Sequence, residues 1–169
     1  MASYESDILA QGLDVVFCGL NPALSAAVAG HNFSHASNRF WTVLHLAGFT
    51  DVRLRPQDER RLLDYGCGIT AAVRRPTRKA SEVSVEEFRQ ARLTFETRMR
   101  HYAPHAIAFL GKSALAAMTD QPHLHWGRQP TEFAGAVAWI LPNPSGLNRA
   151  FTLDALVGAY NQFRVALGK

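Results

Sequence analysis

Two short segments, one near each end of the chain, carry the side chains best suited to chemistry. Residues 19–22 read Gly-Leu-Asn-Pro, and residues 143–149 read Asn-Pro-Ser-Gly-Leu-Asn-Arg. The amide of Asn21 both donates and accepts hydrogen bonds, as do the amides of Asn143 and Asn148. The two segments are therefore candidates for a polar binding site.

The runs that precede these segments are the elements that would position them. Residues 15–18 (Val-Val-Phe-Cys) and 137–141 (Val-Ala-Trp-Ile-Leu) are apolar and strand-like. In a parallel α/β sheet, ligands bind at the edge formed by the carboxyl ends of the strands. We therefore expect both segments to emerge at this edge and to form one site from opposite ends of the sequence.

Apolar strands alternate with helices along the chain, which is typical of a parallel sheet covered on both faces. A chain of 169 residues is long enough for one core that buries roughly two thirds of the unfolded surface. The sequence predicts an α/β fold, namely a single three-layer α/β/α domain over residues 1–169 with a mainly parallel central sheet.

Residues that favour helix ends predict where the helices lie. The first predicted helix spans residues 38–47, with Ser37 as its N-cap and Gly48 as its stop, and the second runs from Pro56 to residues 65–66. A third begins at a capping box at Ser84 and ends before Pro104. Two more begin at residues 111–113 and after a cap at Thr152. Strands are predicted over 67–71 and 105–110. Residues 127–141, split near Gly135, fit a hairpin or two edge strands.

The composition is that of a globular protein, with 47% hydrophobic and 19% charged residues. No apolar run approaches the ~20 residues of a membrane helix, and residues 1–7 lack the basic start and apolar middle of a signal peptide. We expect a soluble cytoplasmic protein without membrane contact. Cys18 and Cys67 lie in apolar strand-like segments, which predicts buried, reduced thiols rather than a disulfide.

The net charge of +4 at pH 7 favours polyanionic partners. Four cations, Arg74, Arg75, Arg78 and Lys79, gather around Pro76 in an expected loop. This run has two interpretations of similar weight: a contact for a polyanion, or a solvated surface that aids solubility.

Two shorter motifs are incomplete. Residues 111–113 (Gly-Lys-Ser) match the end of a phosphate-binding P-loop, but that motif requires Gly where Ala106 stands. His31 and His35 have the spacing of metal ligands on a helix, yet their surroundings indicate a loop and no third ligand accompanies them. We therefore predict no metal site at these histidines.

Four segments together carry a family resemblance. They are residues 19–27 (Gly-Leu-Asn-Pro-Ala-Leu-Ser-Ala-Ala), 30–33 (Gly-His-Asn-Phe), 38–41 (Asn-Arg-Phe-Trp) and 143–149. The chain resembles the mismatch-specific uracil and thymine DNA glycosylases of the uracil-DNA glycosylase superfamily, from about Asp14 to the C-terminal helix. The resemblance implies a DNA repair enzyme that cleaves the N-glycosidic bond of a flipped uracil, needs no metal or cofactor, and leaves an abasic site.

The resemblance also implies roles for individual residues. Asn21 is expected to be the catalytic residue that holds the attacking water, and Phe33 to stack on the base. The expected base pocket consists of Leu20, Ala26, Phe33 and Asn143. The expected DNA contacts are Ser145, Gly146, Leu147, Asn148 and Arg149, together with Lys112, which lies near a predicted strand end. Within this set, Leu147 would fill the stack that the flipped nucleotide vacates.

Four positions depart from relatives in ways that predict behaviour. More efficient uracil glycosylases carry Asp and His where this chain has Asn21 and Asn143, which predicts slower catalysis. Ala23 stands where close relatives usually have Gly, which predicts a perturbed backbone turn beneath the water. Ala26 replaces a Ser of some uracil-selective relatives and matches the Ala of thymine-active ones, which predicts a roomier pocket near the pyrimidine C5.

The expected partner is double-stranded DNA with a G:U or related mismatch, bound by a monomer that prefers guanine opposite its target. Two other functions stay open at this point. A non-catalytic protein that binds lesions or abasic sites would share the same loops. A nucleotide-binding domain acting on small molecules would cleave free deoxyuridine and show no salt-sensitive affinity for duplex DNA.

Overall fold

Five strands form the central sheet, in the order β2-β1-β3-β5-β4. They span Val15–Gly19 (β1), Cys67–Ala71 (β2), Ala106–Leu110 (β3), Gly127–Arg128 (β4) and Val137–Leu141 (β5). β2, β1, β3 and β5 pair in parallel, whereas β4 pairs antiparallel with β5. The carboxyl ends of four strands therefore meet at one edge of the sheet.

The structure is a computed structural model that describes residues 5–169. The segment in which we predict no signal peptide includes residues 1–4, which lie outside the described residues. Within the described residues, no helix is long and apolar enough to cross a membrane.

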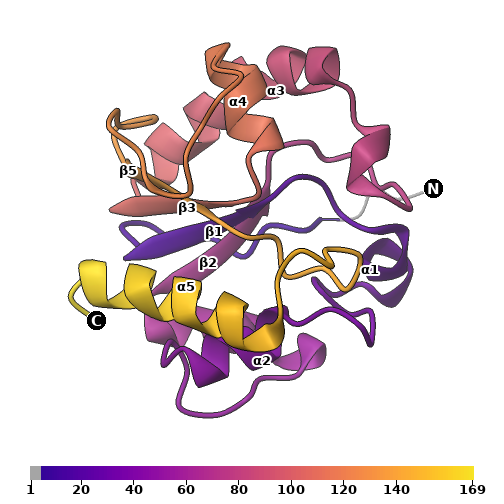
Figure 1. The fold of residues 1–169 in the computed structure, drawn as a ribbon, viewed down its shortest axis with the longest axis vertical. Coiled ribbons are helices and arrows are strands. Elements are labelled where there is room, and N and C mark those ends of the chain that lie inside the picture. Colours follow the sequence, from indigo (N-terminus) through magenta and orange to yellow (C-terminus); the bar gives the residue numbers. More distant parts are fainter. Residues whose placement is uncertain (1–4) are drawn as a thin grey trace.

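Helices cover both faces of the sheet (Figure 1). They are α1 (Leu24–Ala29), α2 (Phe40–Leu46), α3 (Val85–Tyr102), α4 (Ser113–Thr119) and α5 (Leu153–Ala166), with 3₁₀ helices η1 (Pro56–Tyr65) and η2 (Ala80–Glu82). α3 and α4 pack together on one face, and α2 and α5 on the other. This is the three-layer α/β/α arrangement that the sequence predicts.

β1 lies at the centre of the core, and its side chains alternate between the two faces of the sheet. Val15 and Phe17 belong to the apolar cluster under α2 and α5, whereas Val16 and Cys18 belong to the cluster under α3 and α4. The ring of Phe17 packs within an aromatic group formed by Phe40, Phe49, Tyr160 and Phe163. Burial on both faces fixes the strand from which the first polar segment emerges.

Most of the helix ends predicted from the sequence are found in the structure. Ser84 Oγ accepts from the Glu87 N–H at the start of α3, and Thr152 Oγ1 accepts from the Ala155 N–H at the start of α5. The 3₁₀ helix that Pro56 opens ends at Gly66, which has a left-handed backbone. The strand predicted over 67–71 is confirmed as β2.

The predicted Ser37 cap is wrong. α2 begins at Phe40 rather than residue 38, and Arg39 occupies the N-cap position. The side chain of Ser37 instead contacts His35 Nδ1 at 2.8 Å, while Asn38 Oδ1 accepts from the Phe40 N–H. The backbone N–H of Arg39 donates to the carbonyl of Pro144, so a contact with the second polar segment sets where the helix begins.

The structure also tests the predictions for residues 127–141 and for the two cysteines. Residues 127–141 form an antiparallel pair, in which β4 lies at the edge and β5 lies inside the sheet. Cys18 and Cys67 are buried free thiols, as predicted. Desolvation raises the pKa of Cys67 to about 12 and raises that of Cys18 as well, so neither thiol forms a reactive thiolate near neutral pH.

The buried hydroxyl of Tyr160 provides a test of how α5 supports the functional edge. It donates to the carbonyl of Pro142 at 2.8 Å, directly before the second polar segment. Replacing Tyr160 by Phe leaves that buried carbonyl without its partner, so we expect the free energy of unfolding to fall by about 1–2 kcal/mol. Urea denaturation measures this change. Tyr102→Phe, at a half-buried hydroxyl, should change it by less than about 0.5 kcal/mol, and equal effects of the two variants would contradict the role given to this hydrogen bond.

Candidate functional site

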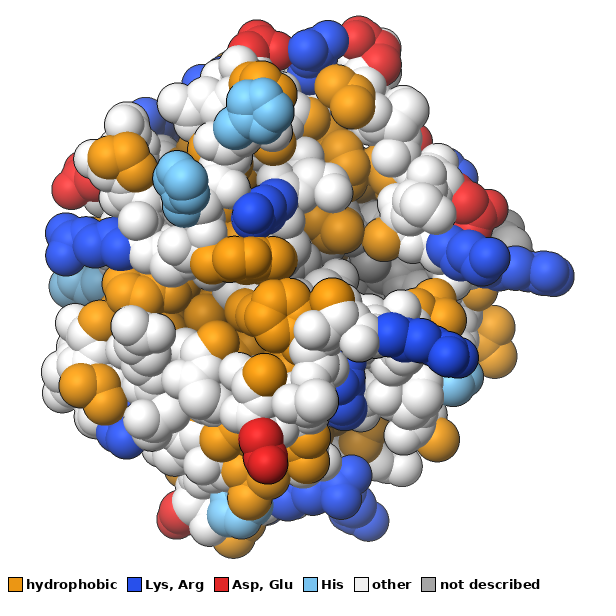
Figure 2. Space-filling view, in the orientation of Figure 1, with side chains coloured by type: hydrophobic (Ala, Val, Ile, Leu, Met, Phe, Trp, Pro, Cys, Tyr) orange, Lys and Arg blue, Asp and Glu red, His pale blue; other side chains and the backbone are white. Residues whose placement is uncertain are grey.

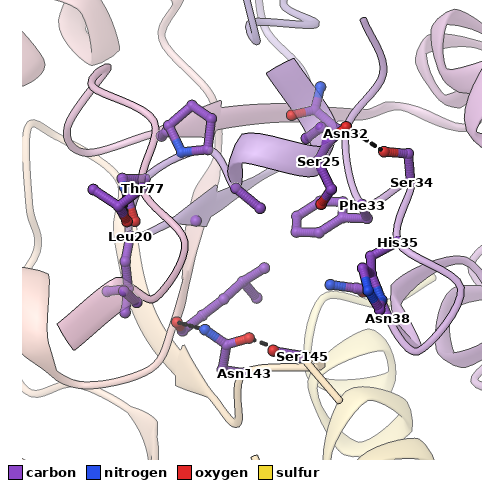
Figure 3. Close-up of a pocket in the computed structure, with 18 of the residues that line it drawn as sticks. Leu20, Ser25, Asn32, Phe33, Ser34, His35, Asn38, Thr77, Asn143 and Ser145 are labelled. Carbon is purple, nitrogen blue, oxygen red and sulfur yellow. Dashed lines mark hydrogen bonds between the residues drawn. The ribbon is translucent and has the colours of Figure 1, made fainter. Parts of the chain in front are cut away.

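A pocket lies at the carboxyl edge of the sheet, where loops from distant parts of the chain meet. It is lined by residues 19–23 after β1, residues 32–35 after α1, Thr77 and Arg78 after β2, and Asn143, Ser145 and Leu147 after β5. Figure 3 shows Phe33, Thr77 and Asn143 around one hollow. Among the described residues, no Asp or Glu lines the pocket. A reaction here must therefore proceed without a carboxylate base or nucleophile at the pocket wall.

The amide of Asn21 is held in a defined orientation. Its Nδ2 donates to the carbonyl of Arg75 and to Thr77 Oγ1, both at 2.8 Å. Because a carbonyl oxygen can only accept, the amide atom that faces Arg75 is the nitrogen. Both protons of Nδ2 are used, which leaves Oδ1 as the atom of Asn21 that can accept a hydrogen bond from a ligand or water.

Thr77 completes this arrangement. Its buried hydroxyl accepts from Asn21 and donates its single proton to the carbonyl of Lys79 at 2.7 Å. The hydroxyl therefore has a fixed direction and offers only a lone pair to Asn21. Sequence reasoning missed Thr77, because it lies 56 residues from Asn21 in a stretch notable only for its cations.

Phe33 has a left-handed backbone, with φ of +51°, which an aromatic residue rarely adopts. One face of its ring stacks on Phe40, with the ring centroids 4.0 Å apart, and the ring also lines the pocket. The side chain is half-buried. Phe33 thus packs against the core through one side of its ring and still lines the pocket.

A buried carboxylate anchors the loop that carries Phe33. Glu59, from η1, accepts from Asn32 Nδ2 at 2.8 Å and lies 2.6 Å from His31 Nδ1. The carbonyl of Asn32 accepts from Trp41 Nε1. These contacts fix the conformation of the loop and hold the strained backbone of Phe33 in place. No sequence pattern singled out Glu59, and within the described residues no group of three His, Cys, Asp or Glu side chains could hold a metal ion.

The second polar segment folds on itself through short hydrogen bonds. Asn143 Oδ1 accepts from the Ser145 N–H at 2.9 Å, and Ser145 Oγ accepts from the Leu147 N–H at 3.2 Å. Asn148 Nδ2 returns to the carbonyl of Asn143 at 2.9 Å. Leu147, at the tip of this loop, is 68% exposed although it is a large apolar side chain.

Arg39 clamps the same loop from below. Its guanidinium donates to four backbone carbonyls, those of Pro144, Ser145, Asn148 and Phe151, at distances of 2.7–3.3 Å. A Cβ at Gly146 would lie 2.8 Å from the carbonyl oxygen of Ser37, so only glycine fits this close approach. Although Arg39 belongs to the family-like segment 38–41, no sequence pattern indicates that it holds this loop.

The structure brings most of the predicted site together. The predicted residues that line the pocket are Leu20, Asn21, Ala26, Phe33, Asn143, Ser145 and Leu147. Gly146, Asn148 and the exposed Arg149 lie in the same loop outside the pocket wall. Lys112 also lies outside it, with Nζ 4.6 Å from the centre of the Trp126 ring.

Local geometry bears on two expectations from the sequence, the turn at Ala23 and the cationic run around Pro76. Ala23 has an extended backbone, with φ of −73° and ψ of 151°, which any residue adopts, so alanine fits this position without backbone strain. In the cationic run, Arg74 pairs with Glu5 and Asp7, and Arg75 pairs with Glu87. Half of that run therefore serves internal ion pairs.

The comparison with known families agrees with this geometry. The family model of the uracil DNA glycosylase superfamily matches residues 7–164. The chain belongs to this superfamily. The match covers β1 through nearly all of α5, and so includes every loop that lines the pocket. Membership in the uracil DNA glycosylase superfamily supports DNA glycosylase activity, the hydrolysis of the bond between a base and its deoxyribose.

Thr77 gives a direct test of whether the fixed amide of Asn21 matters for base release. Thr77→Val keeps the shape but removes the acceptor for Asn21 Nδ2. We expect single-turnover release of uracil from DNA to slow by roughly tenfold, the equivalent of one hydrogen bond at about 1.4 kcal/mol.

Thr77→Ser is the matched control, because it keeps the hydroxyl. Its rate should stay within about twofold of the unmodified protein, a change of under 0.5 kcal/mol. A valine variant as fast as the serine variant would remove Thr77 from the positioning of Asn21.

Proposed function

We propose that this chain is a monofunctional mismatch-specific uracil-DNA glycosylase. It flips uracil out of duplex DNA, preferentially opposite guanine, and hydrolyses the N-glycosidic bond to leave an abasic site. The observation that carries this proposal is the orientation of Asn21, whose Nδ2 is fully used and whose Oδ1 remains to hold a water in a pocket without a carboxylate. The proposal extends to thymine and other modified pyrimidines as further substrates, because the small side chain of Ala26 lines the pocket wall.

The reaction follows from the groups in the pocket. The bond between C1′ and the base nitrogen breaks first, and its electron pair leaves on the uracil. The resulting oxocarbenium-like sugar accepts a weak nucleophile, so a water oriented by Asn21 Oδ1 suffices to form the new bond to C1′. The proton of that water passes to the released base or to solvent.

Stabilisation of the departing uracil anion must supply most of the acceleration, since none of the described residues in the pocket wall carries a carboxylate that would ionise the water. The backbone N–H groups near Leu20 and Phe33 are the proposed donors, while the ring of Phe33 stacks on the base. Asn143 lines the opposite part of the pocket. A site that orients the water without ionising it is expected to turn over slowly.

The loop of residues 145–149 is proposed to stabilise the flipped state. Flipping costs a few kcal/mol of stacking and pairing. Leu147 is exposed at the tip of a loop that Arg39 and Gly146 hold rigid, so it can fill the vacated space without further ordering. We propose that Ser145, Gly146, Asn148 and Arg149, which belong to the same loop, contact the widowed base or its phosphates.

Asn21→Ala tests the catalytic assignment. We expect single-turnover release of uracil opposite guanine to fall by roughly 10²–10⁴-fold, the range for loss of a positioned catalytic group, while binding to abasic product DNA persists. A strand-nicking assay after alkaline cleavage of the abasic site measures the rate. Uracil opposite guanine or adenine, thymine opposite guanine, and single-stranded uracil DNA form the substrate series.

Asn161→Ala is the matched control, because this amide donates to the carbonyl of Ala47 beneath α5, away from the pocket. Its rate should stay close to that of the unmodified protein. An Asn21→Ala rate within about threefold, well short of the expected loss, would contradict the catalytic role. Tight binding of abasic DNA without release of any base would instead favour a non-catalytic lesion-binding protein.

Leu147→Ala tests the flipping loop separately from the chemistry. Removing the side chain should slow uracil release from duplex DNA by roughly tenfold, about 1.4 kcal/mol of lost flipped-state stabilisation. Release from single-stranded DNA should hardly change, because no stack needs filling. Leu93→Ala, at another exposed apolar side chain on α3, should affect neither substrate. Equal loss on both substrates would show that Leu147 supports the pocket instead.

A further inference from the structure

A cluster of two aromatic rings and one cation lies beside the pocket without forming part of it. Trp126 is 45% exposed, Lys112 Nζ lies 4.6 Å from the centre of its ring, and the ring of Phe151 packs against it at 5.4 Å in an edge-to-face geometry. Figure 2 shows hydrophobic side chains gathered near the middle of one face, with a cationic side chain directly above them. We call Lys112, Trp126 and Phe151 the aromatic platform.

The aromatic platform is continuous with the proposed site on two sides. A Cβ at Gly111, the neighbour of Lys112, would lie 3.9 Å from Leu20 and 4.0 Å from Asn143, both in the pocket wall. The carbonyl of Phe151 accepts from Arg39, the same side chain that holds the loop of Leu147. A strand of DNA that delivers a nucleotide to the pocket therefore passes next to the platform.

The local charge favours a polyanion. No Asp or Glu lies within five residues of Lys112 or Trp126 in the sequence, and the acidic residue nearest to Phe151 in the sequence is Asp154, at the start of α5. Lys112 holds its ammonium group over the ring of the exposed Trp126 indole, and Arg149 is exposed in the adjoining loop. The flexible Lys112 side chain can move from the ring to pair with a phosphate, and the indole then stacks a nucleobase.

We propose that the aromatic platform binds an unpaired nucleobase next to the target nucleotide, with the base stacked on Trp126 and its phosphate on Lys112. This inference rests on the proposed function, because it takes DNA as the substrate. A stacked base needs a free face, so the site serves single-stranded or locally opened DNA rather than intact duplex. The platform thus gives this glycosylase a way to hold targets where no opposite strand supports the flipped state.

The test compares how variants of Trp126 and Lys112 bind single-stranded and duplex DNA. Trp126→Leu removes the π face, Trp126→Phe keeps a smaller one, and Leu93→Ala removes an exposed apolar side chain elsewhere. Trp126→Leu should weaken binding of a single-stranded oligonucleotide by roughly 5- to 150-fold and leave duplex binding within about twofold, while Trp126→Phe retains most of the affinity. Lys112→Gln should reduce the salt dependence of single-strand binding by about one phosphate contact.

Fluorescence identifies the contact itself. Trp126 is the most exposed of the three tryptophans, since Trp41 is buried and Trp139 is half-buried. A single-stranded oligonucleotide should quench the fluorescence of the unmodified protein and not that of Trp126→Phe. An oligonucleotide of equal length with abasic sugars beside the target should cause little quenching.

Three results would overturn the proposal: equal single-strand affinity of Trp126→Leu and the unmodified protein, equal quenching by the abasic oligonucleotide, or equal losses on single strands and duplex. Failure of the platform alone leaves release of uracil from duplex DNA intact in every variant. Failure of the proposed function is different, because no variant and no substrate would then release uracil.

Discussion

Parallel pairing of β1 with β2 and β3, and of β3 with β5, is the constraint on which the site depends. It places the carboxyl ends of these strands at one edge, so the loops that follow them meet although the loops after β1 and β5 are more than 120 residues apart in sequence. The aromatic cluster around Phe17 holds β1 from one face, and the cluster around Phe95 and Phe109 packs against the other. The pocket can then be shaped by short loops because the strands that carry them are packed on both faces.

Side chains in this pocket are oriented because their hydrogen-bond donors are paired with protein acceptors. The carbonyl of Arg75 and the hydroxyl of Thr77 accept both protons of Asn21 Nδ2, and the Thr77 hydroxyl donates to the carbonyl of Lys79. Arg39 orients the loop of Leu147 by donating to four of its backbone carbonyls. Groups fixed in this way need little reorganisation when a ligand arrives, which is the condition under which weak catalytic groups are effective.

The sequence predicts the parts of this site that depend on local patterns. Asn21 and Asn143 follow strand-like runs, and the caps at Ser84 and Thr152 lie where side-chain and backbone preferences agree. Long-range contacts are outside the reach of such patterns. Thr77, Arg39 and Glu59 each act on a loop at least 27 residues away, and nothing next to them in sequence marks the task. Ser37 failed as a cap because the contact of Arg39 with Pro144 took precedence over a local preference.

The central claim is that Asn21 Oδ1 holds the water that attacks C1′ of a flipped uracil. A crystal structure of the protein bound to duplex DNA containing 2′-fluoro-deoxyuridine opposite guanine tests it most directly, because the fluorine slows bond cleavage. We predict uracil stacked on Phe33 and a water roughly 2.7–3.2 Å from Asn21 Oδ1, on the face of C1′ opposite the base. A uracil that remains in the DNA stack, or a water held in line with C1′ by another group, would contradict the account.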